Sequence, residues 1–213
     1  MLKYFDKENI VIPIFAGSDY TIPRQIKEVE NNMIDKEKIK ALTKEFLLAI
    51  GEDPNREGLL DTPKRVADMC EELLNPERAN MKYTVFDSSN YGGIVLVRDI
   101  EFSSVCEHHL MPFIGKVHIA YIPGKKVIGI SKLARIVDKH AKRLQLQERL
   151  TKEILDDIQS SLDPEGVAIY MEAQHLCMNI RGITRRNAST TTTLFSGAFE
   201  DFKMQELFMD LIK

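Results

Sequence analysis

Two long runs of β-branched and aromatic residues constrain the fold of this chain more than any other feature of its sequence. Residues 93–105 and 113–122 are rich in Ile, Val and Phe, a composition typical of β-strands. Two further β-like runs, 166–173 and 190–195, follow after a stretch of helical periodicity. Because the strands come in pairs with helices grouped between them, the order predicts an α+β fold. We expect an antiparallel sheet with helices on one face.

Helices are predicted before these strands. Apolar residues recur at helical spacing over 34–50, and Gly51 then ends that helix. A Thr-Pro pair at 62–63 provides an N-cap and a proline at the first helical position, so a second helix should run to about residue 74. Cys70 lies inside this helix, and we interpret it as a packed thiol.

Three more helices are expected among the strands. A Pro-Gly turn at 123–124 precedes a short β-like segment at 127–128, and Ser131 then opens a helix. Residues 145–162 carry apolar side chains on one side of the next helix, and 199–212 form a closing helix. The predicted organisation is a loose N-terminal arm (1–33), a helical region (34–92) and a folded domain (93–213).

The bulk composition excludes several classes of protein. The 213 residues are 44% hydrophobic and 29% charged, as in an ordinary globular protein with one domain and a helical appendage. A net charge of -3 argues against a nucleic-acid binder with a broad basic surface. The early apolar run 10–17 is broken by Pro13 and is too short to span a membrane. Three widely spaced cysteines form no disulfide framework, which predicts a cytoplasmic protein.

Two short clusters of cysteine and histidine point to metal chemistry. Residues 106–109 read Cys-Glu-His-His between the first two long predicted strands, and residues 175–177 read His-Leu-Cys after a later strand. Such soft and borderline donors suit zinc, whereas magnesium and calcium prefer oxygen. A catalytic zinc site uses three protein ligands and leaves a position for water. Two of five candidates would then remain for proton transfer; the candidates are Cys106, His108, His109, His175 and Cys177.

Other interpretations of these clusters stay open at this point. A structural zinc knuckle would bind the metal with four ligands and leave no position for water. The clusters could also be unrelated His-Cys pairs, because a single C-x-x-H pattern is common by chance. A second cluster of the same chemistry favours one shared metal site. We interpret His118, in a predicted strand, and His140, in a predicted helix, as structural or solvated.

Basic residues near two helix starts suggest an anion site. Ser131 resembles an N-cap, which places Lys132 and Arg135 in or beside the first helical turn. Cations there oppose the helix dipole, and a bound anion would reverse that unfavourable interaction. Lys64 and Arg65 repeat the pattern after the Thr-Pro pair. Solvated basic residues at a helix start are the ordinary alternative, but two instances in a chain with a metal cluster favour a nucleotide pocket.

Several blocks of this sequence resemble the signatures of GTP cyclohydrolase I. The agreement is almost unbroken from about residue 97 to residue 197 and weaker over 61–65. Long blocks in the right order are far more specific than any single one. The blocks are Cys-Glu-His-His (106–109), Gly-Ile-Ser-Lys-Leu-Ala-Arg-Ile-Val (129–137), Gln-Leu-Gln-Glu-Arg-Leu-Thr (145–151), His-Leu-Cys-Met (175–178) and Arg-Gly-Ile (181–183).

The resemblance implies a fold, an assembly and a reaction. The fold is a tunnelling fold (T-fold), over 93–213, whose subunits join around a β-barrel as a homodecamer of two stacked pentamers. Active sites would lie at subunit boundaries. The reaction converts GTP and water into 7,8-dihydroneopterin triphosphate and formate, the first step toward folate and related pterins. No nucleic-acid or membrane partner is expected.

The resemblance also implies a role for each site residue. The zinc ligands would be Cys106, His109 and Cys177, and the proton-transfer residues would be His108 and His175. The residues that read guanine would be Gln147 and Glu148. The residues that hold the ribose and triphosphate would be Ser131, Lys132, Arg135 and Arg181, with Arg65 as an addition.

The chemistry of the reaction is consistent with these residue types. Zinc lowers the pKa of a bound water to about 7, and histidine titrates in the range that a general acid needs. A glutamate can accept two hydrogen bonds from the amidic edge of guanine, which adenine lacks. The sequence alone, without the resemblance, favours an ordinary glutamate in the first turn of a helix for Glu148.

Two competing functions would use the same residues differently. A non-catalytic scaffold stabilised by zinc would need a closed site with four ligands, one of them His108 or His175. A related T-fold enzyme would act on a pterin or a deazapurine precursor, but the set of arginines and lysines suited to a triphosphate disfavours it. A measurement of metal coordination separates the scaffold from the enzyme.

Overall fold

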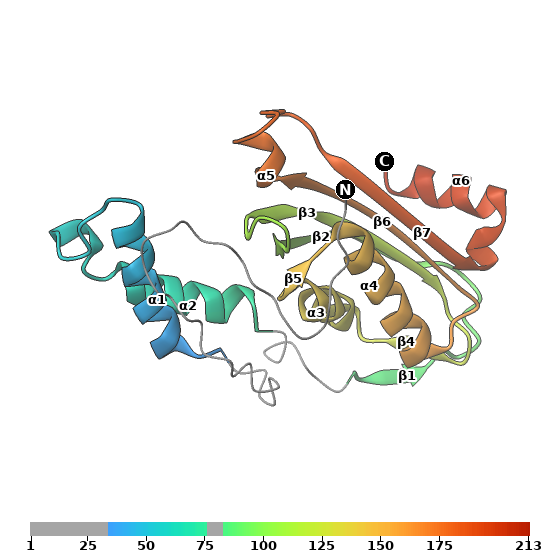
Figure 1. The fold of residues 1–213 in the computed structure, drawn as a ribbon. Coiled ribbons are helices and arrows are strands. Elements are labelled where there is room, and N and C mark those ends of the chain that lie inside the picture. Colours follow the sequence, from blue (N-terminus) through green and yellow to red (C-terminus); the bar gives the residue numbers. More distant parts are fainter. Residues whose placement is uncertain (1–33, 76–82) are drawn as a thin grey trace, which may run out of the picture. The chain divides into compact units, whose positions relative to one another are not determined.

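The computed structural model describes residues 34–75 and 83–213, and the predicted N-terminal arm 1–33 lies outside them. Figure 1 shows the elements in chain order. The helices are α1 (Lys36–Ala49), α2 (Thr62–Leu73), α3 (Ile130–Ala141), α4 (Gln147–Leu162), α5 (Leu176–Asn179) and α6 (Phe202–Leu211), with short 3-10 helices at Glu57–Leu59 and Ala198–Glu200. The strands are β1 (Val85–Asp87), β2 (Val95–Cys106), β3 (Pro112–Ile122), β4 (Lys126–Ile128), β5 (Leu144–Gln145), β6 (Gly166–His175) and β7 (Thr190–Gly197).

The end of α1 is set by the glycine that the sequence singled out. Gly51 has a φ of 83°, a left-handed conformation that costs glycine nothing. Its N–H donates to the Leu48 carbonyl at 3.0 Å, and the Glu52 N–H donates to the Leu47 carbonyl at 2.9 Å. This pair of bonds is a Schellman motif, which satisfies carbonyls that the helix itself leaves unpaired.

The larger sheet has five strands in the order β5-β2-β3-β6-β7, and β1 pairs with β4 in a separate two-stranded sheet. Every pair in the larger sheet is antiparallel except β2 with β5, which is parallel. Val105 of β2 lies opposite Pro112 of β3, and Phe113 of β3 lies opposite His175 of β6. The carboxyl ends of β2 and β6 therefore meet at one end of the sheet, which brings the two Cys-His clusters together.

The helices cover both faces of the curled sheet (Figure 1). Alternate residues of β3 divide between two cores, because successive side chains of a strand point to opposite faces. Ile119 and Tyr121 pack in the core that α3 and α4 close, whereas Ala120 and Ile122 pack with Phe208 of α6. The expectation of helices on one face is thus right for α3 and α4 and wrong for α6.

The residues interpreted as structural have protein partners. His140 on α3 lies with its Nε2 2.9 Å from the carboxylate of Asp157 on α4. His118 accepts a hydrogen bond at Nδ1 from the Asp99 backbone N–H, at 3.3 Å. Cys70 is half-buried in α2, and burial raises the pKa of its thiol. Within residues 34–75 and 83–213, no helix is long and apolar enough to cross a membrane.

Candidate active site

The first cluster forms a tight turn between β2 and β3. The Cys106 N–H donates to the Met111 carbonyl at 2.8 Å, and the Leu110 N–H donates back to the Cys106 carbonyl at 2.9 Å. Leu110 has a φ of 52°, so this turn reverses the chain within a few residues. We refer to residues 106–109 as the metal turn. It holds Cys106 buried at the end of its strand and leaves His109 exposed.

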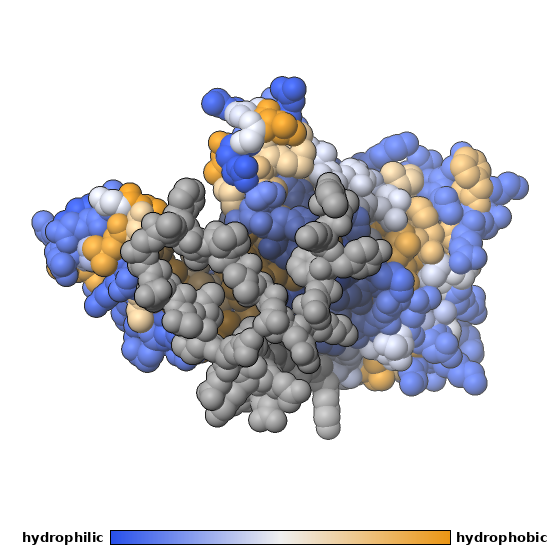
Figure 2. Space-filling model, in the orientation of Figure 1, coloured by the Kyte–Doolittle hydropathy of each residue, from blue (hydrophilic) through white to orange (hydrophobic). Residues whose placement is uncertain are grey.

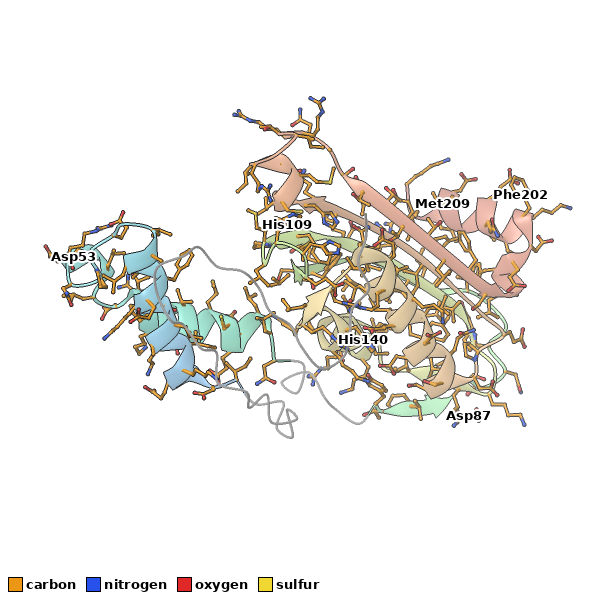
Figure 3. The ribbon with its side chains drawn as sticks, viewed as in Figure 1. Asp53, Asp87, His109, His140, Phe202 and Met209 are labelled. Carbon is orange, nitrogen blue, oxygen red and sulfur yellow. The ribbon has the colours of Figure 1, made fainter. Side chains whose placement is uncertain are left out.

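The second cluster supplies the third ligand atom. Cys177 lies in α5, directly after β6, and its ligand atom lies within 4.8 Å of those of Cys106 and His109. The Cys106 Sγ is 4.0 Å from Nδ1 of His109. In a tetrahedral zinc site, bond lengths of about 2.3 Å to sulfur and 2.0–2.1 Å to nitrogen place such atoms roughly 3.6–3.8 Å apart. The three side chains therefore need only a small contraction to bind zinc. Figure 3 shows His109 at this end of the sheet.

The environment of the two thiols also fits a soft cation. Burial raises the pKa of the Cys177 thiol, and the nearby Cys106 raises it further. Two thiols this close are costly to ionise together unless a cation lies between them. Because the ligands are sulfur and nitrogen, the chemistry of the site favours zinc over cations that bind oxygen.

His175 ends β6, two residues before Cys177, and its ring is held on two sides. Its ring stacks on the ring of Phe113, with centroids 4.7 Å apart and planes 2° from parallel. Its Nε2 lies 2.8 Å from Oε1 of Gln147, the first residue of α4. Burial lowers the pKa of His175, and the charge of Glu148 opposes that effect. The ring is thus fixed in place by Phe113 and Gln147.

Gln147 determines which nitrogen of His175 carries a proton. Its amide Nε2 lies 3.3 Å from the Met171 carbonyl and 2.9 Å from the Thr190 carbonyl, both of which only accept. Nitrogen therefore faces these carbonyls, and Oε1 faces the histidine. His175 must donate from Nε2, which leaves Nδ1 as the acceptor of the neutral ring. The Gln147 side chain is 1% exposed, so it supports His175 and does not line an open pocket.

The other two residues predicted for this end of the site are exposed. His108 lies in the metal turn beside His109, with ring centroids 6.2 Å apart and an edge-on arrangement. Glu148 lies in the first turn of α4, where a carboxylate interacts favourably with the helix dipole. Its carboxylate is free to meet a ligand from solvent.

Arg181 follows α5 in an exposed loop. Its charge is close enough to act on Cys177, whose thiol pKa it lowers slightly against the larger effects of burial and Cys106. Figure 2 shows hydrophobic surface on the same loop among hydrophilic residues, and there Ile180 and Ile183 are 64% and 62% exposed. A loop that combines cations with exposed isoleucines is suited to contact a further molecule.

The helix that carries Ser131, Lys132 and Arg135 begins at the opposite end of the sheet. The Ile128 N–H donates to the Tyr121 hydroxyl at 3.2 Å, so α3 starts beside Tyr121. Tyr121 lies eight residues along β3 from Phe113, roughly 26 Å at the rise of a strand. The helix that carries these three predicted phosphate ligands therefore begins at the end of the sheet away from Cys106 and His175.

The expectation that Ser131 caps this helix is wrong. The helix begins at Ile130, and Gly129 is the cap residue, with its carbonyl accepting from the Lys132 N–H at 2.7 Å. Ser131 is the second helical residue and makes no capping bond. The cap at α2 differs in the same way, because Asp61 and not Thr62 precedes the helix.

Arg65 is the predicted ligand with the weakest structural support. It lies on the exposed surface of α2, with Nη2 3.3 Å from the Asp61 carboxylate. That pair is solvent-exposed on both sides, 71% for Arg65 and 73% for Asp61. An exposed pair of this kind is weak, so the guanidinium remains available to another anion.

The sequence analysis did not identify three residues that contact the site. Phe113 stacks on His175, Thr192 accepts from the Gln147 amide at 3.2 Å, and Arg149 contacts Glu107 of the metal turn. Phenylalanine and threonine in strands give no signal of a site. Arg149 gives one, since it is a cation in the first turn of a helix, the same signal that the sequence analysis used for Lys132.

Comparison with known proteins agrees with this geometry. The family model described as GTP cyclohydrolase I matches residues 39–213. The protein named GTP cyclohydrolase 1 from Sulfurihydrogenibium sp. is 52% identical over 182 residues, which cover 84% of this chain and 96% of that protein. The proteins of the same name from Aquifex aeolicus and Bacillus subtilis are each 52% identical, over 84% and 79% of this chain and 98% and 90% of theirs. The chain belongs to the GTP cyclohydrolase I family.

Proposed function

We propose that this protein is a zinc-dependent GTP cyclohydrolase I. It opens the imidazole ring of the guanine of GTP with water, releases formate and gives 7,8-dihydroneopterin triphosphate for folate or other pterins. The observation that carries the proposal is the convergence of Cys106, His109, Cys177 and His175 at one end of the sheet, in a chain of this family.

Zinc would be held by Cys106, His109 and Cys177. When bound, it supplies a Lewis acid that makes water nucleophilic near neutral pH. Among the residues that the structure describes, the side chains close enough to share a metal ion are Cys106, His109 and Cys177, without His108 or His175. A site with three protein ligands leaves room for water, which favours the enzyme over the four-ligand scaffold.

The two remaining histidines would move protons. Because Nε2 of His175 is bonded to Gln147, we assign its exchangeable proton to Nδ1. His108, exposed in the metal turn, is placed for the later proton shifts that rearrange the opened sugar. Gln147 then acts through His175, and we no longer assign its side chain to guanine.

Glu148 would bind the amidic edge of guanine. Glu148 is exposed, and it directly follows Gln147, whose side chain contacts His175. Two acceptor oxygens match the two N–H donors of guanine and not the edge of adenine, so the contact selects guanine.

The triphosphate would lie between two chains. Arg181 follows α5, which carries Cys177, whereas Lys132 and Arg135 lie on α3, which begins at the other end of the sheet. A second subunit that presents its α3 to the first would bring both sets together. This supports the proposal of a T-fold oligomer, in which two pentamers would form a decamer. In each chain, 93–213 would be the catalytic domain and 34–92 a helical region. Arg65 would be an added ligand of the triphosphate.

The cysteines fit a reducing compartment. All three, Cys70, Cys106 and Cys177, are free thiols. Free thiols that serve as metal ligands persist where disulfides do not form. We therefore propose that the protein is cytoplasmic.

The direct test is incubation of the zinc-loaded protein with GTP. Formate should appear, together with a pterin that fluoresces after oxidation. ATP should give neither product, and guanosine should be a very poor substrate even at saturation, because it lacks the phosphates that position the purine. Bound zinc without formate would instead support the scaffold.

A further inference from the structure

Arg149 links the metal turn to the start of α4. Its guanidinium Nη2 donates to the Glu107 carboxylate and, at 3.0 Å, to the Leu144 carbonyl. Its Nε donates to Oε1 of Gln145 at 2.7 Å. One planar group therefore contacts the residue after Cys106 and both residues of β5.

Gln145, which accepts a hydrogen bond from Nε of Arg149, is itself held rigidly. Gln145 is fully buried, and its amide Nε2 donates to the His140 carbonyl at 3.0 Å and to the Glu153 carboxylate at 2.7 Å. The Gln145 carbonyl accepts the Glu107 N–H at 3.1 Å. The oxygen that receives Arg149 is thus fixed by bonds to α3 and α4, so the guanidinium has a fixed support.

The position of Arg149 is electrostatically unfavourable without Glu107. It is the third residue of α4, where the positive end of the helix dipole repels a cation. The Glu107 carboxylate compensates that repulsion. The two side chains are only 38% and 31% exposed, so solvent screens the pair less than a surface ion pair. The contact with Glu107 of the metal turn therefore explains why a cation occupies this unfavourable position.

We propose that Arg149 is a positioning residue of the active site, which fixes the metal turn relative to Gln147 and Glu148. The inference rests on the proposed zinc site. Within the described residues, Arg149 touches none of the three ligand side chains, and it acts on Cys106 and His109 through Glu107 and the turn. A guanidinium is required because it donates in two directions at once, to Gln145 and to Glu107, which a lysine ammonium on a flexible stem does poorly.

The test uses three single variants and one double variant of the full chain, and two measurements that do not depend on GTP turnover. Arg149→Lys keeps the charge and loses the planar fork, and Glu107→Gln keeps the shape and loses the charge. Lys152→Gln is the matched control, because it breaks an ion pair with Asp156 on the same helix that is 59% and 50% exposed. Zinc affinity is measured by competition with a chelator, and site geometry by the visible absorption spectrum of the Co²⁺-loaded protein.

Arg149→Lys and Glu107→Gln should each weaken zinc binding about 10–100-fold and change the Co²⁺ spectrum. The double variant should bind zinc no more weakly than the weaker-binding single variant, because the two substitutions remove the same contact. Lys152→Gln should match the wild type. Thermal unfolding of each apo variant checks that it is folded.

Wild-type zinc affinity and Co²⁺ spectrum in a folded Arg149→Lys protein would overturn the inference, as would additive losses in the double variant. Failure of the proposed zinc site would look different, since the wild type itself would then bind no metal.

Discussion

Nε2 of His175 lies 2.8 Å from Oε1 of Gln147, so the first residue of α4 fixes the ring of the last residue of β6. Gln147 is held in turn by the carbonyls of Met171 and Thr190. The proposed acid-base group, His175, is therefore oriented by backbone atoms of the sheet, which are among the most rigid groups in the chain. This arrangement separates the role of Gln147 from that of Glu148, its neighbour in sequence.

Replacement of Gln147 tests this separation. Gln147→Met keeps the volume and removes every hydrogen bond, so His175 loses its orientation, and kcat should fall about 10–100-fold with little change in KM. The unpaired carbonyls should also lower the free energy of unfolding by about 1–3 kcal/mol. Thr192→Val, which removes one of the contacts to the amide, is the milder control. A raised KM with unchanged kcat would return Gln147 to guanine recognition.

Removal of a thiolate ligand should abolish metal binding and activity together. Cys106→Ser and Cys177→Ser replace a soft donor by a hard one, and zinc content, measured by elemental analysis of the purified protein, should fall from one per chain to near zero. His108→Ala and His175→Ala should retain zinc and lose rate on the order of 10²–10⁴-fold. Full zinc in either serine variant would refute the ligand assignment.

Mixed oligomers test whether two chains share one site. Cys177→Ser removes the metal end, and Arg135→Ala removes the phosphate end, so each variant alone should be nearly inactive. If every site combines the metal end of one chain with α3 of another, random mixing at equal amounts should restore roughly a quarter of the wild-type rate. The rate of co-expressed, co-purified protein measures this. No recovery in verified mixed oligomers would place both ends of the site in one chain.

The carboxylate of Asp157 should make stability depend on pH. Burial alone would raise its pKa, but hydrogen bonds from His140, Lys139 and Tyr83 outweigh burial and hold the pKa well below its usual range. A lowered folded pKa stabilises the protein above the unfolded pKa of about 3.9, and the stabilisation is lost as pH falls toward the folded value.

Asp157→Asn should therefore destabilise the protein on the order of 2 kcal/mol at pH 7, with a smaller difference from wild type below about pH 4. Denaturant titrations at several pH values measure this. Asp156→Asn on the same helix removes an exposed pair with Lys152 and should change stability very little. An equal loss at every pH would show that packing, and not the charge of Asp157, stabilises this region.

The long elements could be predicted from sequence because their period repeats many times. The helix expected over 34–50 is Lys36–Ala49, and the strand expected over 113–122 is Pro112–Ile122. The strands β1 and β5 have three and two residues, too few to show a period. The apolar side of α6 shows in the sequence, but which face of the sheet it covers depends on alternate residues of β3 such as Ala120 and Ile122.

Some residues of the candidate site could likewise be predicted from sequence, whereas others could not. Cysteine and histidine in short clusters are rare enough that their chemistry identifies them, and the structure brings Cys106, His109 and Cys177 within 4.8 Å. Phe113 could not be identified, because its contact with His175 comes from the pairing of β3 with β6. The prediction that Ser131 caps α3 is wrong, because serine is also common inside a first turn. The residue that adopts the cap conformation is Gly129.

The short stretch from Gln145 to Arg149 also limits how this region can change in length. Gln145 pairs with Cys106, Gln147 supports His175, and Arg149 turns back to Glu107. One residue inserted after Leu146 would rotate the rest of α4 by about 100° and advance it by about 1.5 Å, which would move Arg149 off Glu107. Substitutions here change one contact at a time, whereas an insertion or deletion between Gln145 and Gln147 displaces Gln147 and Arg149 together, so this segment is expected to keep a constant number of residues.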